Sequence, residues 1–177
     1  MFGDSLSAGY GIPTERSWPS LLDRRLAEAR LDYQIANASI SGETTAGGLS
    51  RLPAALDRFK PKIVVLALGA NDGLRGLPTA QMRDNLNAMI DLARARRARV
   101  LLIGMRLPPN YGPDYDRDFE QSFVSVASGA KVPLLPFLLA PIAAEFKYFQ
   151  ADGIHPTAAA QIRILDHVWP ALKPLLN

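Results

Sequence analysis

The sequence predicts an α/β fold in which helices cover both faces of a parallel β-sheet. Apolar runs of strand length alternate with amphipathic helical patterns along the 177 residues, as βαβ units require. The run over residues 62–68 (KIVVLAL) lacks polar alternation, so both of its faces are predicted to be buried, as in the centre of such a sheet. No linker, internal repeat or low-complexity stretch interrupts this pattern. We therefore expect a single domain over residues 1–177.

The first half of the chain is expected to hold three strands and two helices. Only Met1 and Phe2 precede Gly3, where the first βα loop should begin, so the given sequence is expected to start inside the first strand. The next apolar residues recur at helical spacing, with a proline near the first turn. They predict a helix over 18–29, followed by a short strand over 33–38, a helix over 52–59 and the strand over 62–68.

The second half continues the alternation. A long helix is predicted over 79–97, and a buried strand follows over 100–105. After a proline-rich loop over 106–115, Phe119, Phe123 and Val126 indicate another helix, and 132–135 is a last short strand. From Thr157 onward the tail is predicted to be helical, and Pro170 is expected to kink or end that helix.

Composition excludes several classes of protein. Hydrophobic residues make up 48% and charged residues 21% of the chain, which is typical of a globular domain and not of a disordered one. The net charge is +3 with both signs scattered, and the arginines at 94–99 fit the solvated end of a helix, so no nucleic-acid partner is expected. The absence of cysteine excludes disulfides, thiolate nucleophiles and Cys-ligated zinc. No apolar run approaches the roughly 20 residues of a membrane span.

Chemistry-bearing residues gather in the loops that should follow the strands. Ligands of open parallel sheets bind beyond the carboxyl ends of the strands, so these loops are the first place to search for a site. They supply a hydroxyl, a glycine amide, a carboxamide and an Asp/His pair. The four segments are Gly3-Asp4-Ser5-Leu6-Ser7, Ser41-Gly42-Glu43-Thr44, Gly69-Ala70-Asn71-Asp72 and Asp152-Gly153-Ile154-His155-Pro156.

This inventory meets the requirements of acyl transfer. The hydroxyl of Ser5 needs a base to accept its proton, and His155 is the candidate, with Asp152 three residues earlier to orient the imidazole. The backbone N–H groups of Ser5 and Gly42 and the side-chain amide of Asn71 can converge on a developing oxyanion. Taken singly, Ser5 could be a helix cap, Gly42 a residue with positive φ and Asn71 part of a turn. Their positions after successive strands favour the catalytic interpretation.

The four segments resemble, in order and over nearly the whole chain, the sequence blocks of the SGNH/GDSL hydrolases. Longer strings narrow the resemblance to the bacterial thioesterase I/protease I/lysophospholipase L1 group. They are Asn37-Ala38-Ser39-Ile40-Ser41-Gly42, Asn71-Asp72-Gly73-Leu74-Arg75-Gly76, Arg106-Leu107-Pro108 with Asn110-Tyr111-Gly112, and Asp152-Gly153-Ile154-His155-Pro156.

The resemblance implies a three-layer α/β/α, flavodoxin-like fold with a sheet of about five parallel strands. It implies Ser5 as nucleophile with His155 and Asp152, an oxyanion hole of Ser5, Gly42 and Asn71, and no metal or other cofactor. Members of the group hydrolyse acyl thioesters, lysophospholipids and simple esters, and are often exported. A periplasmic or secreted location is therefore expected, but the apolar residues and signal peptide that usually precede the first block are missing here. A cytoplasmic location stays open.

Apolar residues surround the expected site on several loops. We expect them to form a groove for an acyl chain, which would favour medium or long chains over acetyl, since each buried CH₂ contributes about 0.8 kcal/mol. The alternative is that they anchor their loops to the domain. The residues are Leu74, Leu77, Leu107, Pro108, Tyr111 and Ile154.

The sequence thus predicts a monomeric serine hydrolase that cleaves fatty acyl esters and thioesters, with a small-molecule substrate as its partner and peripheral contact with lipids at most. Two other enzymes would use the same residues, namely a carbohydrate O-acetyl esterase and an acyltransferase. A non-enzymatic flavodoxin-like binding module is a third alternative, which the complete set of blocks disfavours.

Overall fold

A computed structural model describes residues 1–108 and 110–176. Within these residues, a parallel sheet of four strands has the order β1-β2-β3-β4. Val64 lies opposite Val100 in the central pair, and Leu102 lies opposite Leu134 at the edge. The predicted parallel sheet is confirmed. Its strands are β1 (Phe2–Gly3), β2 (Ile63–Ala67), β3 (Arg99–Ile103) and β4 (Leu134–Leu135).

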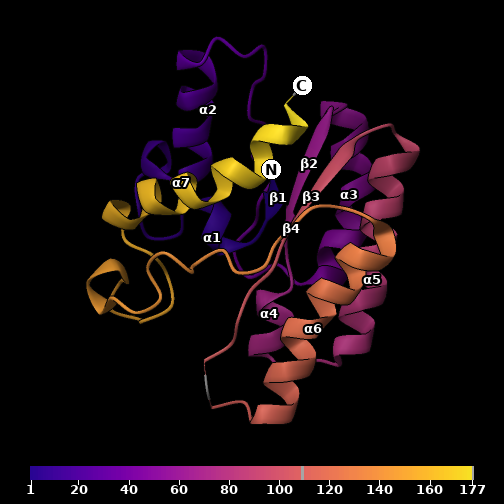
Figure 1. Ribbon diagram of the computed structural model, residues 1–177, viewed down its shortest axis with the longest axis vertical. Coiled ribbons are helices and arrows are strands. Elements are labelled where there is room, and N and C mark those ends of the chain that lie inside the picture. Colours follow the sequence, from indigo (N-terminus) through magenta and orange to yellow (C-terminus); the bar gives the residue numbers. More distant parts are fainter. Residues whose placement is uncertain (109, 177) are drawn as a thin grey trace.

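Helices cover both faces of the sheet and make the three predicted layers. In Figure 1, α2 and α7 lie on one side of the strands, and α3, α5 and α6 lie on the other. The helices are α1 (Ser5–Ala8), α2 (Trp18–Glu28), α3 (Thr45–Phe59), α4 (Ala70–Leu74), α5 (Thr79–Ala95), α6 (Pro113–Ala130) and α7 (Gln161–Leu172). Short 3₁₀ turns occupy Thr14–Arg16, Phe146–Tyr148, Ala158–Ala160 and Lys173–Leu175.

Successive residues of the central strands supply two separate cores. Val65 and Leu101 pack with α2 and α7, whereas Leu66 and Leu102 pack with α3, α5 and α6. Neighbouring residues of a strand point to opposite faces, so a strand between two helical layers must be apolar throughout. This is why the run over 62–68 shows no alternation.

The predicted strand over 33–38 is not a strand in the structure. The segment nevertheless lies beside β1, because the Met1 amino group donates to the Ala36 carbonyl (2.8 Å) and the Ala38 amide donates to the Met1 carbonyl (2.9 Å). The amide of Ile35, however, donates to the carboxylate of Asp23 and not to a neighbouring strand. Residues 36–40 thus run beside β1, with a further hydrogen bond from the Ile40 amide to the Gly3 carbonyl (3.0 Å), but they form no regular strand, and the sheet has four strands in the described residues and not five.

The last helix also differs in its ends from the prediction. It begins at Gln161, after a 3₁₀ turn, and the Gln161 side chain accepts a hydrogen bond from the amide of Trp18 at the start of α2. Pro170 lies inside α7, which continues to Leu172 before giving way to the final 3₁₀ turn. So close to the C-terminal end, the missing N–H of proline costs one hydrogen bond without stopping the helix.

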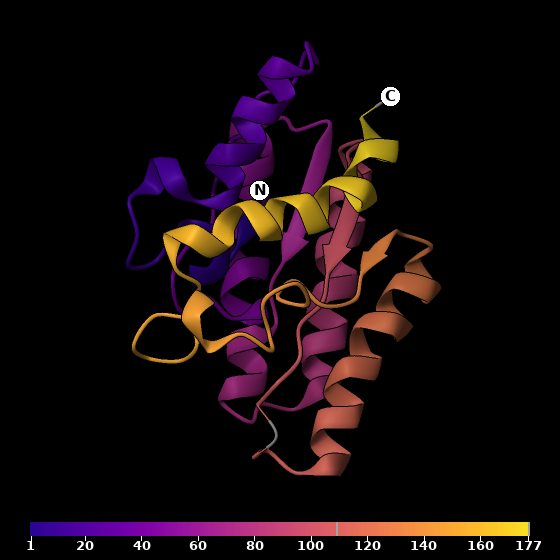
Figure 2. The same ribbon diagram turned by 60° about the vertical axis from the view of Figure 1, so that its left-hand side comes forward.

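The parallel strands present their carboxyl ends at one edge, where α1 and α4 begin. Figure 2 shows the segment between β4 and α7 crossing the molecule beside these ends before it enters α7. This brings the loop over 149–156 to the same edge as the first loop of the chain. No helix in the described parts of the chain is long and apolar enough to cross a membrane.

Candidate active site

The first βα turn places Ser5 at the start of a helix. The chain leaves β1 at Gly3, and Asp4 caps α1 by accepting a hydrogen bond from the amide of Leu6 (3.0 Å). Ser5 is the first residue of that helix and is only partly buried, so its hydroxyl reaches the cavity at the edge of the sheet. Asp4 thus ties the first loop to the start of α1.

His155 and Asp152 lie on one tight turn. The turn is closed by a bridge between Phe149 and Pro156, and by a hydrogen bond from the Gln150 amide to the His155 carbonyl (2.7 Å). One carboxylate oxygen of Asp152, Oδ1, accepts from the amides of Ile154 (2.9 Å) and His155 (3.0 Å). The other, Oδ2, lies 2.7 Å from Nδ1 of the His155 ring.

The ring of His155 connects this turn to Ser5. Its Nε2 lies 2.9 Å from the Ser5 Oγ across 150 residues of sequence. With Asp152 accepting the Nδ1 proton, Nε2 keeps its lone pair and faces the hydroxyl as a base must. The ring of Tyr10 packs against the imidazole with centroids 4.4 Å apart, which further restricts the orientation of His155.

The pKa values of two carboxylates of the site are shifted in opposite directions. The amides of His155 and Ile154, together with the His155 ring, lower the pKa of Asp152 to about 2, so this carboxylate is ionised at neutral pH. Burial raises the pKa of Asp4 to about 6, although the Leu6 amide and His155 favour its charged form. Asp152 is thus the carboxylate equipped to stabilise a positive imidazole.

Asn71 and Gly42 approach the serine from two neighbouring loops. Asn71 lies on α4 and donates through Nδ2 to the Glu43 carbonyl (3.0 Å), with a longer contact to Asp4 Oδ2 (3.4 Å). Gly42 has φ +79° in a turn closed by a hydrogen bond from the Glu43 amide to the Ile40 carbonyl, which is the geometry of a type II turn with glycine at its third position. Ser5, Asn71 and His155 all line one cavity, and Gly42 is not part of that lining.

That cavity has a volume of about 390 Å³ and a mostly apolar wall. Four of the six expected groove residues line it, namely Leu74, Leu107, Pro108 and Ile154. Leu77 and Tyr111 do not: Leu77 lies on the surface, and the Tyr111 hydroxyl donates to the Leu74 carbonyl (2.9 Å). Further apolar side chains complete the wall, which are Leu6, Met105, Phe137, Leu139, Ala143 and Phe149.

The sequence did not reveal the buried support beneath the site. Asp72 is 4% exposed and accepts hydrogen bonds from the Thr45 amide (2.8 Å) and the Thr45 hydroxyl (2.5 Å). Asn85 donates to that hydroxyl in turn (3.0 Å). Asp72 was visible only as the neighbour of Asn71, because nothing local in the sequence indicates that three helices will meet at its carboxylate.

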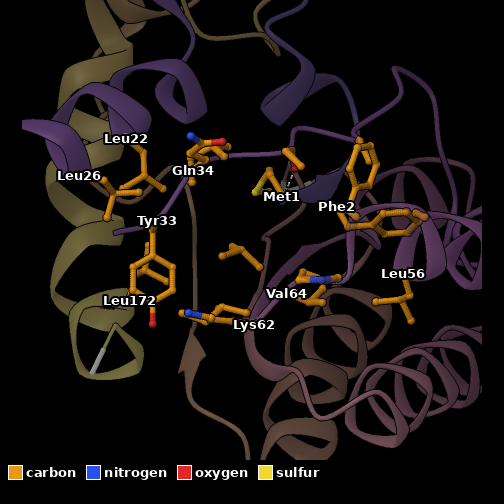
Figure 3. A pocket seen from close by; sticks show the side chains of 18 of the residues that line it. Met1, Phe2, Leu22, Leu26, Tyr33, Gln34, Leu56, Lys62, Val64 and Leu172 are labelled. Atoms are coloured by element: carbon orange, nitrogen blue, oxygen red, sulfur yellow. Dashed lines mark hydrogen bonds between the residues drawn. The ribbon is translucent and has the colours of Figure 1, made fainter. Parts of the chain in front are cut away.

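A second cavity lies at the opposite end of the sheet (Figure 3). It has a volume of about 140 Å³ and lies among Phe2, Tyr33, Val64 and Leu172, with Lys62 at its wall. No serine, histidine or carboxylate belongs to its lining, so the cavity offers no groups for acyl transfer. Within residues 1–108 and 110–176, no three His, Asp or Glu side chains gather as a metal site would require.

Comparison with known proteins places this chain in a family. Residues 1–161 match the model of the GDSL-like Lipase/Acylhydrolase family. The chain is 53% identical to Esterase TesA of Pseudomonas aeruginosa over 98% of its own length and 87% of that protein's. It is 40% identical to Thioesterase 1/protease 1/lysophospholipase L1 of Escherichia coli, over 100% of this chain and 84% of the relative.

Solved structures agree with these sequence matches. A crystal structure of the psychrotrophic esterase EstA from Pseudoalteromonas sp., inhibited by monoethylphosphonate, superposes with a TM-score of 0.95 and 40% identity. The match covers 99% of this chain and 96% of that one.

Proposed function

The chain belongs to the GDSL-like lipase/acylhydrolase family and is a carboxylic ester hydrolase, and from that premise we propose that it cleaves fatty acyl esters and thioesters through Ser5, His155 and Asp152. The observation that carries the proposal is the hydrogen-bonded series from Ser5 Oγ through the His155 ring to the Asp152 carboxylate. Such a series is what an activated serine nucleophile needs.

The proposed reaction has two steps. Ser5 Oγ attacks the carbonyl carbon while Nε2 of His155 takes its proton, and Asp152 stabilises the imidazolium that forms. The oxyanion accepts hydrogen bonds from the amides of Ser5 and Gly42 and from Asn71, whose long contact to Asp4 leaves one N–H weakly held. His155 then returns its proton to the leaving alcohol or thiol. Water then attacks the acyl-enzyme carbonyl while His155 takes its proton, and His155 returns that proton to Ser5 Oγ as the fatty acid leaves.

The apolar cavity supports a fatty acyl group as the substrate. Its wall includes Leu74, Leu107, Phe137 and Ile154, and the nucleophile lies in the same lining. A chain of several CH₂ groups would gain about 0.8 kcal/mol for each one buried, whereas acetyl would leave the cavity unfilled. We expect the enzyme to act as a monomer, and an exported, periplasmic location stays a prediction from the family.

The test is hydrolysis of p-nitrophenyl esters from acetate to palmitate, with palmitoyl-CoA and lysophosphatidylcholine alongside. Wild type is compared with Ser5→Ala and with Ser7→Ala, a control two residues along the same helix whose hydroxyl is buried and has no hydrogen-bond partner among the described residues. We expect activity to peak at medium or long chains, to persist in Ser7→Ala and to vanish in Ser5→Ala.

Other outcomes would redirect the assignment. Full activity in Ser5→Ala removes the proposed nucleophile. Cleavage of acetate alone would keep the nucleophile but contradict the acyl cavity, and acetylated sugars would then be tested. Transfer to added alcohols that outpaces hydrolysis would indicate an acyltransferase.

A further inference from the structure

Asn71 of α4 and Arg75, the residue that follows the end of this helix, bind consecutive carbonyls of the turn that carries Gly42. Asn71 donates to the Glu43 carbonyl (3.0 Å), and the Arg75 guanidinium donates to the Gly42 carbonyl (2.9 Å). Asn71 and Arg75 are four residues apart, which places them on one face of the helix, and the Arg75 amide bonds back to the Asn71 carbonyl (3.2 Å). The short helix α4 and the residue directly after it therefore hold the turn at two adjacent points.

Packing does little to hold this turn. Ile40 is 48% exposed, and Ser41 and Gly42 also lie at the surface. Glycine at φ +79° adds conformational freedom that other residues lack. The position of the Gly42 amide relative to Ser5 and Asn71 therefore depends on hydrogen bonds to the turn's own backbone.

A second arginine secures the turn from its other side. Arg51 donates to the Ala38 carbonyl (2.9 Å) and pairs with the Glu43 carboxylate (2.6 Å). These contacts hold the chain just before the turn, at Ala38, and the last residue of the turn, Glu43. Between them, the Gly42 peptide has the Arg75 guanidinium as its side-chain partner.

We propose that Arg75 is a positioning residue for the oxyanion hole: by binding the Gly42 carbonyl from the C-terminal end of the helix that carries Asn71, it fixes the position of the Gly42 amide relative to the Asn71 side chain. The inference rests on the proposed function, in which both groups stabilise the oxyanion. A hydrogen-bond donor contributes to catalysis only when it is already at the place where the negative charge develops. Loosening the turn should therefore slow the chemistry while leaving substrate binding intact.

The competing role for Arg75 is recognition of an anionic leaving group, such as a phosphate ester. Two observations favour positioning. The guanidinium is engaged with a backbone carbonyl, and Arg75 is not part of the cavity lining. The experiment must still separate the two roles, because an exposed arginine could serve either.

The test compares Arg75→Met and Arg75→Lys with wild type on a neutral p-nitrophenyl ester of the preferred chain length and on palmitoyl-CoA, whose leaving group carries phosphates. Arg94→Met is the matched control, since Arg94 also donates to a backbone carbonyl, that of Lys131, at the end of α5 far from the site. We expect kcat of Arg75→Met to fall about 10- to 100-fold with KM changed less than about threefold, because complete loss of one oxyanion donor costs about 10²–10³. Arg75→Lys, which keeps a donor, should lie between Arg75→Met and wild type, and Arg94→Met should match wild type.

A second measurement, the rate of inactivation by a phosphonate, reports on stabilisation of the oxyanion. The rate at which a neutral alkyl p-nitrophenyl phosphonate inactivates each variant should fall in parallel with kcat/KM, since its phosphoryl oxygen occupies the oxyanion position. Thermal unfolding of every variant shows whether the fold is intact.

The positioning role is overturned if Arg75→Met keeps the wild-type kcat and inactivation rate, or if its only defect is a higher KM for substrates with anionic leaving groups. It is also overturned if activity falls only in proportion to lost folded protein. These results differ from failure of the proposed function, in which Ser5→Ala would stay active or wild type would not hydrolyse any ester.

Discussion

At the scale of the residue, the site contains two aspartates whose surroundings in the folded protein shift their pKa values in opposite directions. Asp152 is partly exposed and bonded to two amides and an imidazole, which lowers its pKa. Asp4 is 2% exposed, and burial raises its pKa to about 6. The folded protein therefore binds a proton at Asp4 more tightly than the unfolded chain does. Its contribution to stability is complete below about pH 4 and is lost as the pH rises through about 6.

Replacing Asp4 by asparagine should remove this pH dependence. Asparagine also caps helices and can accept the Leu6 amide, but it carries no charge that burial would penalise. We expect Asp4→Asn to exceed wild type in free energy of unfolding by about 1–3 kcal/mol above pH 6, with the difference shrinking towards pH 4. Urea unfolding from pH 4 to pH 8 measures it, with the exposed Asp32→Asn as control. Parallel curves for wild type and Asp4→Asn would contradict the assignment.

At the scale of the element, the turns and short helices of the site depend on the helices behind them. The carboxylate of Asp72 on α4 accepts two hydrogen bonds from Thr45 at the start of α3, and Asn85 of α5 donates to the same hydroxyl. Thr45 is 0% exposed. One buried polar cluster thus joins three helices directly beneath Asn71.

Removing the Thr45 hydroxyl should loosen this junction. Thr45→Val keeps the shape of the side chain but leaves a buried carboxylate and an amide each short of one partner, which costs about 2–3 kcal/mol. For a chain of this size the melting temperature should fall by roughly 5–10 °C. Thermal unfolding followed by circular dichroism measures the change, and Thr14→Val, at an exposed position, is the control. Equal melting temperatures for the two variants would show that the cluster is not stabilising.

At the scale of the whole molecule, one sheet serves two cores. Leu101 and Leu102 are adjacent in β3, both 0% exposed, and point into opposite layers. If residues 1–177 fold as a single domain, damage to either layer must weaken the same cooperative transition. If the layers were independent, each substitution would affect only part of the unfolding.

Leu101→Ala and Leu102→Ala should each lower the free energy of unfolding by about 2–5 kcal/mol, from lost burial and the cavity left behind. Both should shift one single transition, as seen by heat or urea unfolding with fluorescence and circular dichroism together. Ile162→Ala, at a residue that is 46% exposed, should change stability by less than about 1 kcal/mol. Two separated transitions in either core variant would refute the single domain.

The sequence by itself determined the features that depend on neighbouring residues. Unbroken apolar runs predicted the two-sided burial of β2 and β3, and the order of the loops placed Ser5, Asn71 and the Asp152/His155 pair at one edge of the sheet. These features follow from backbone geometry, because parallel strands all end on the same side and a buried strand has no polar face.

Only the tertiary structure decided which distant groups meet. It brought His155 Nε2 to 2.9 Å from Ser5 Oγ, left residues 33–38 outside the regular sheet, and placed Leu74 in the cavity wall while Leu77 stayed at the surface. It also brought the Arg75 guanidinium within hydrogen-bonding distance of the Gly42 carbonyl. These outcomes depend on how side chains from several elements share space and hydrogen bonds, and a pattern of nearest neighbours along one chain does not contain that information.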